Sequence, residues 1–257
     1  MAMPKPAAEP VILTPAEMAV VFQQMLGPSV AEGGLLGDLN LEPPALDAAR
    51  ARLLERGLLR PAPDRSRPRT FIAPGARALF GAVTRPLMLG VLQVMRPGQP
   101  ECGAYFSWTP DLLVCNTVDA RGNHCLEPLP DLGAVADRAR AECGLERFAP
   151  QTVPLPPNPD AVGRAASLRA IFMTVASART AHEQVSGLAW LLSAGRLWLM
   201  APQSASQPAP PQPAAAPTPS AGAGLKVLLV ADLHATILAA VQHAVDHTRA
   251  VLEAAAA

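Results

Sequence analysis

The chain has 257 residues, with 21 basic and 21 acidic residues and therefore no net charge. Half of the residues are hydrophobic and only 16% are charged, which excludes a wholly disordered chain and argues against a general polyanion-binding protein. The most apolar stretches, 87–95 and 185–201, do not predict membrane spans, because the first is too short and the second contains Arg196. Residues 1–10 lack the apolar core of a signal peptide, so we expect a cytoplasmic protein whose four cysteines are reduced.

The N-terminal part of the chain is predicted to be helical. Thr14 and Glu17 form a capping-box pattern, and the apolar residues that follow recur at helical spacing. Two further helices are expected at about 44–56 and 74–83, because each has a proline at its start and an apolar stripe. The proline- and arginine-rich segment 60–70 between them is expected to be a loop.

After this part the pattern changes to strands, and it occurs twice. A continuous apolar run at 87–96 predicts a central strand, and Thr109-Pro110-Asp111 predicts the turn of a hairpin. Order and spacing from residue 170 onward repeat this run of four strands and a helix. The expected fold class is therefore α/β (α+β), with two pseudo-repeated ββββα units that form a mainly antiparallel sheet covered by helices.

The same patterns predict the domain organisation. The second unit contains a proline-rich insert at 202–224, which has no bulky apolar residue and is expected to be disordered. Asp232 is expected to cap the long final helix. The predicted segments are a disordered N-terminus at 1–10, a helical and winged-helix-like part at 11–86, a first unit at 87–145, a connection at 146–169 and a second unit at 170–257.

Four features of the sequence together point to a known family. They are an early helix, a helix that ends in the L-x-x-x-G-L pattern at 53–58, the Arg85-Pro86 step into an apolar strand, and two quasi-symmetric halves. In these features the chain resembles the EspG family of chaperone-like proteins of type VII secretion. The resemblance covers about residues 11–255, and the chain departs from it in its short hairpin at 109–111 and its long insert. It implies a non-enzymatic chaperone or adaptor that holds a helical secretion substrate, of PE–PPE type, soluble in the cytosol.

A shorter resemblance leaves an alternative function open. Residues 46–80 are similar to the recognition helix, wing and next helix of MarR-like winged-helix regulators. Segment 45–86 has nine arginines and three acidic residues, a local charge of +6. The alternative is therefore a DNA-binding transcriptional regulator, and the competing interpretation is a solvated arginine face. The candidate phosphate contacts are Arg50, Arg52, Arg56, Arg65, Arg67 and Arg69.

Aromatic residues beside the predicted hairpin turns are the candidate contacts for a protein partner. They have two interpretations, core packing or exposed anchors, and tryptophan is enriched where interfaces bind most strongly. The candidate partner-binding residues are Phe106, Trp108, Leu112, Trp190 and Trp198.

The sequence contains no motif that predicts catalysis. There is no P-loop, no G-x-S-x-G and no dinucleotide-binding glycine pattern in context. His243 and His247 are spaced to share a metal, but a solvated helix face is the favoured interpretation, and the cysteines at 102–125 are expected to be small buried residues. We expect no enzyme activity, no metal and no cofactor.

Overall fold

The structure is a computed structural model that describes residues 9–27, 42–61, 70–146, 159–177, 182–193, 195–200, 225–227 and 230–256. Four predicted features lie wholly or largely outside these residues: the N-terminus 1–10, the loops at 27–44 and 60–70, and the insert at 202–224. Residues 147–158, half of the predicted connection at 146–169, also lie outside them. What the sequence indicates about them stays a prediction.

The described residues of the N-terminal part contain three helices: α1 (Pro15–Leu26), α2 (Pro43–Glu55) and α3 (Pro74–Thr84). Each begins with proline, whose fixed φ and missing N–H suit the first helical turn. The predicted capping box is present: the Glu17 N–H donates to Thr14 Oγ1 at 3.2 Å, and the Thr14 N–H donates to Glu17 Oε2 at 2.8 Å. Strands β2 (Leu59–Pro61) and β3 (Thr70–Ile72) pair between α2 and α3, in the position predicted for a wing.

In the described part of the chain, nine strands form one antiparallel sheet in the order β1-β7-β6-β5-β4-β8-β9-β10-β11. The strand bounds are β1 (Val11–Leu13), β4 (Met88–Met95), β5 (Cys102–Trp108), β6 (Leu113–Val118), β7 (His124–Leu129), β8 (Ala166–Ser177), β9 (His182–Ser193), β10 (Arg196–Met200) and β11 (Leu225–Val227).

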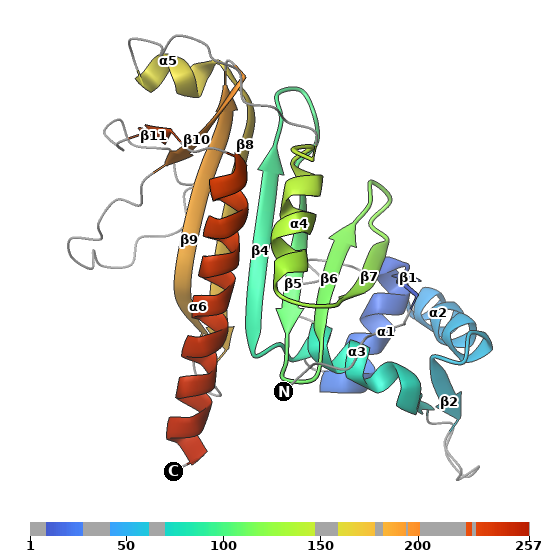
Figure 1. The fold of residues 1–257 in the computed structure, drawn as a ribbon. Helices are drawn as coiled ribbons and strands as arrows, with labels where there is room; N and C mark the ends of the chain where they lie inside the picture. Colours follow the sequence, from blue (N-terminus) through green and yellow to red (C-terminus); the bar gives the residue numbers. More distant parts are fainter. Residues whose placement is uncertain are drawn as a thin grey trace, which may run out of the picture.

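Two ββββα units build this sheet, as the sequence predicts. Strands β4–β7 lead into α4 (Gly133–Glu142), and strands β8–β11 lead into α6 (Val230–Ala256). The units meet where β4 and β8 pair antiparallel, with Met88 opposite Ala176 and Met95 opposite Arg169. Each unit then extends outward from this pair by successive hairpins, so the sheet has an approximate two-fold arrangement (Figure 1).

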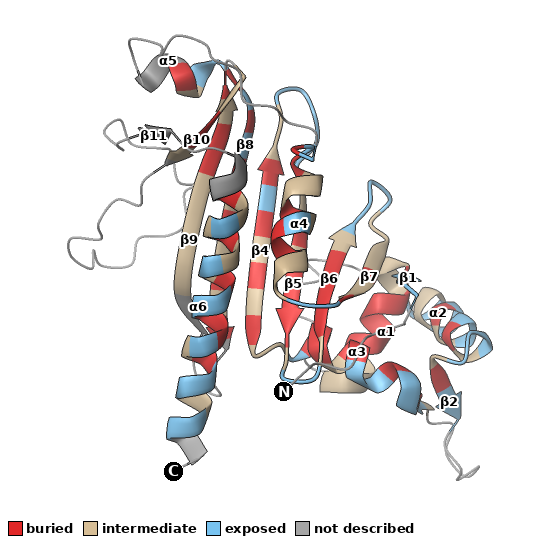
Figure 2. Ribbon diagram, in the orientation of Figure 1, coloured by how far each residue is buried: buried red, intermediate tan, exposed pale blue. Residues whose placement is uncertain are grey.

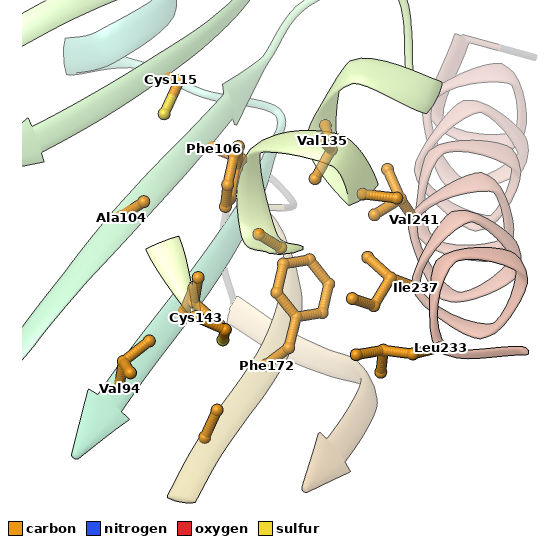
Figure 3. Packing of buried hydrophobic residues seen from close by; sticks show 14 of the residues in the cluster. Val94, Ala104, Phe106, Cys115, Val135, Cys143, Phe172, Leu233, Ile237 and Val241 are labelled. Atoms are coloured by element: carbon orange, nitrogen blue, oxygen red, sulfur yellow. The ribbon is translucent and has the colours of Figure 1, made fainter. Parts of the chain in front are cut away.

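Helices cover the two faces of the sheet differently. Helices α4 and α6 pack on the face that we call the front, and Leu233, Ile237 and Val241 of α6 meet Phe172 and its neighbours there (Figure 3). The N-terminal helices form a second core with β6 and β7 on the opposite, back face, around Val114 and Leu126. The short helix α5 (Pro159–Arg164) contacts β9. Figure 2 shows that the buried residues of α6 lie on its side toward the sheet.

The structure also corrects two details of the prediction. The final helix begins at Val230, so Asp232 lies inside its first turn and is not the residue before the helix. Strands β1 and β2 are three residues each and were not predicted, because their pairing partners are distant in the sequence or separated by the arginine-rich segment.

Candidate functional site

The structure places four of the five candidate partner-binding residues in the core. Phe106, Trp108, Trp190 and Trp198 are only 0–5% exposed, and Leu112 is half-buried. The first three pack between the sheet and α4 or α6, and Trp198 packs with Val162 of α5, Ala166 and Leu191. The interpretation of these aromatics as exposed anchors is therefore wrong, because a partner cannot reach their rings. The role of Leu112 stays a prediction.

The candidate DNA-contacting arginines of α2 make ion pairs within the protein. Arg52 Nε and Arg56 Nη1 approach the two carboxylate oxygens of Glu17 at 3.3 and 3.4 Å, and the Glu17 side chain is only 4% exposed. Arg50 pairs with Asp47 at 2.8 Å. Arg52 and Arg56 thus attach α2 to α1, which supports the structural interpretation of these two side chains. Arg65, Arg67 and Arg69 lie outside the described residues, and DNA contact stays a prediction.

A cavity of about 30 Å³ lies on the back face, between α1, α3 and strands β4–β7. Apolar side chains form much of its wall, and the remaining wall consists of polar side chains, one of them a histidine. Its lining residues are Met18, Phe22, Val83, Leu89, Tyr105, Ser107, Asn116 and His124. This volume exceeds that of a single water molecule and suits the end of one side chain, so the cavity is too small for a cofactor.

His124 gives the cavity its electrostatic character. Its Nδ1 lies 3.2 Å from Asn116 Oδ1, and the direction of this hydrogen bond depends on the tautomer of the ring. Burial lowers the pKa of His124, so the ring is neutral at neutral pH. The cavity therefore accommodates an uncharged group. Strand alternation places His124 and its neighbour Cys125 on opposite faces of the sheet.

Of the three cysteines at 102–125 that were expected to be buried, Cys115 is buried, whereas Cys102 and Cys125 are half-buried. Cys115 and Cys143 are at most 4% exposed, and burial raises the pKa of each thiol to about 12. Both remain protonated at neutral pH and are inert packing residues rather than nucleophiles.

The described residues contain neither a candidate metal centre nor a candidate membrane-spanning helix. No group of three or more histidine, cysteine, aspartate or glutamate side chains is arranged to hold a metal ion. None of the helices in this part of the chain is both long and apolar enough to cross a membrane.

Comparison with known proteins identifies the architecture. No protein-family model matches the sequence, and no curated protein matches it. Among solved structures, the chain is similar to the Mycobacterium tuberculosis type VII secretion system chaperone EspG5, solved in complex with the PE25–PPE41 dimer. The match covers 91% of this chain and 96% of that chain, with a TM-score of 0.56 and 9% sequence identity.

The chain shares the fold of EspG5. At 9% identity the agreement lies in the arrangement of strands and helices and not in particular side chains. The match extends over nearly the whole of both chains. The expected resemblance is thereby confirmed at the level of fold.

Proposed function

We propose that this protein is a non-enzymatic, EspG-like chaperone or adaptor that binds a helical secretion substrate and keeps it soluble in the cytosol. The observation that carries the proposal is the fold similarity to EspG5 over nearly the whole of both chains. EspG5 is described as a type VII secretion chaperone in complex with a dimer of two other proteins. Our proposal transfers that class of function, and not those partners, to this chain.

Two features of the structure agree with a binding role. The Cys115 and Cys143 thiols are buried and protonated, so they do not act as nucleophiles. The cavity on the back face is uncharged and mostly apolar, which suits a protein side chain better than a reactive substrate.

Affinity capture from the native cytosol tests the proposal. The full-length tagged protein should retain a specific helical protein in stoichiometric amount after washing at high salt, since an apolar contact resists screening. A retained DNA fragment from the protein's own upstream region, with no protein partner, would instead favour the winged-helix alternative. In that case, changing Arg50 to Ala should weaken the DNA complex.

A further inference from the structure

Apolar side chains of β4 and β8 lie on the back face of the sheet. These two strands are neighbours in the middle of the strand order. Because side chains alternate along a strand, the residues on this face are the neighbours of the buried front-face residues Met88, Leu92 and Phe172. We call them the open strip. Its members are Leu89, Val91, Ile171, Met173 and Val175, and all five are half-buried.

The pairing register shows how the open strip continues into the cavity. One row across the sheet runs Asn116–Tyr105–Val91–Met173, and the next includes Ser107, Leu89 and Val175. Asn116 and Ser107, which the N-terminal helices cover, are 6% and 2% exposed. The cover ends at Tyr105 and Leu89, which line the cavity and are themselves half-buried. The cavity is therefore a recess at one side of the strip.

The dimensions of this surface match one helix. From β5 to β9 the floor spans three strand spacings, about 14 Å, and a helix with its side chains is about 10–12 Å wide. The front face gives a precedent, because α6 packs across β4, β8 and β9 there. From Leu89 to the level of Arg169, which pairs with Met95 at the end of β4, the distance is about 20 Å, which corresponds to about 13 helical residues.

Charge defines the two ends of the strip. Arg85 is exposed just before β4 and donates from Nη2 to the Met25 carbonyl at 2.6 Å. Arg169 is exposed on β8 beyond Ile171 and donates from Nη2 to the Gly163 carbonyl at 2.8 Å. Each guanidinium is held by one backbone contact and keeps further donors that can bind a carboxylate. A complementary ligand is therefore apolar along its centre and acidic at its ends.

We propose that the open strip binds an amphipathic helix of a protein partner, with acidic residues facing Arg85 and Arg169 and one uncharged side chain inserted in the back-face cavity. This inference rests on the proposed function for the nature of the partner. The strip, the cavity and the two arginines determine the shape and charge of the ligand.

The experiment uses a synthetic helical peptide of about 16 residues with leucines at i, i+3, i+4 and i+7 and glutamates at both ends. Full-length protein carrying ¹³C-methyl methionine is titrated with up to about 1 mM peptide, where weak complexes are detected. The Met173 methyl on the strip and the Met18 methyl in the cavity should shift and saturate together. The Met88 methyl, which is buried on the front face, should not shift. Saturable binding that moves Met88 and not Met173, or no binding at all, would overturn the proposal.

Substitutions test whether the apolar strip and the charge of Arg169 contribute to peptide binding. Met173→Glu should weaken peptide binding at least about tenfold, because it places a charge in an apolar contact. The matched control is Phe71→Glu, a change at a 42% exposed residue of the small sheet, which should bind normally. Arg169→Glu should weaken binding and regain it with a peptide that has glutamates at one end and lysines at the other, whereas Arg77→Glu, at an exposed residue of α3, should do neither. Equal affinities for Arg169→Glu and wild type would contradict the acidic-end assignment.

These outcomes distinguish a failure of the proposed binding surface from a failure of the proposed chaperone function. A positive titration combined with failure to capture any cytosolic protein would reject the chaperone role and retain the binding surface. A captured partner whose complex is unaffected by Met173→Glu would retain the role and reject the surface.

Discussion

The rings of Phe106 and Phe172 lie 6.0 Å apart with their planes tilted by 57°. They come from different ββββα units, and they meet over Gly90 of β4, where an added Cβ would lie 3.3 Å from Phe106 Cβ and 3.3 Å from Phe172 Cζ. The absence of a side chain at Gly90 thus allows the two halves of the front-face core to contact each other directly.

Changing Gly90 to Val should destabilise the protein. The added methyl groups must displace one or both phenyl rings from the packed core, and overpacking of this kind costs about 1–3 kcal/mol. Chemical denaturation should show a lower midpoint with an unchanged slope. The control is Gly75→Ala in α3, where an added Cβ meets nothing within 4 Å, so this change should be neutral or slightly stabilising. Equal stability of Gly90→Val and wild type would refute the packing assigned to this position.

Trp108 should behave as a core residue and not as a contact residue. It is 2% exposed, and the Arg249 guanidinium lies 5.4 Å from its ring centroid, over the ring. Trp108→Ala should therefore lower the free energy of unfolding by about 3–5 kcal/mol. Thermal melting measures this, and Leu112→Ala, at a half-buried neighbour, should have a much smaller effect. An unchanged melting temperature for Trp108→Ala would restore the interpretation of Trp108 as an exposed anchor.

Glu17 should stabilise the N-terminal helices beyond its capping role. Its carboxylate completes the capping box and also receives Arg52 and Arg56 from α2. Glu17→Ala removes the cap interaction and hydrogen bonds to charged groups, so we expect a loss of about 2–4 kcal/mol. Arg52→Ala, which leaves the cap intact, should cost less because this arginine is 47% exposed. If the two variants were equally stable, the buried carboxylate would not be the centre of the contact.

Acidification should destabilise the fold through His124. Burial lowers its folded-state pKa below the unfolded value of about 6.5, so below that pH the unfolded chain binds a proton that the folded chain does not. The contribution of His124 is thus fully present above pH 6.5 and decreases as pH falls toward the lowered pKa. Urea denaturation between pH 7.5 and 5.5 measures this slope, and His124→Gln should flatten it. A slope that is identical in the variant would show that His124 is not responsible.

Local signals in the sequence predicted much of the fold. The Thr14–Glu17 capping box correctly predicted the start of α1. The apolar run at 87–96 correctly predicted a central strand, β4, whose residues alternate between the buried front face and the more exposed back face. The pairing of β4 with β8 was not predictable, since it joins residues about 80 apart and no local pattern encodes a partner.

The sequence did not predict which apolar side chains are buried and which are exposed. The position of Trp108 beside a turn is compatible with either face of the sheet, and only the placement of α6 buries it on the front. The open strip was missed for the complementary reason: Met173 and Val175 have the composition of core residues, and which face the helices leave uncovered depends on the tertiary arrangement.

The measurement that tests the chaperone proposal most directly is the solubility of the captured partner alone and with this protein. The partner is refolded by dilution, and light scattering is followed with increasing amounts of wild-type protein, Met173→Glu or Phe71→Glu. We predict that wild-type protein and Phe71→Glu suppress aggregation fully near an equimolar ratio, because one strip binds one helix, and that Met173→Glu does not. A partner that stays soluble without the protein, or aggregates equally in its presence, would contradict the proposed function.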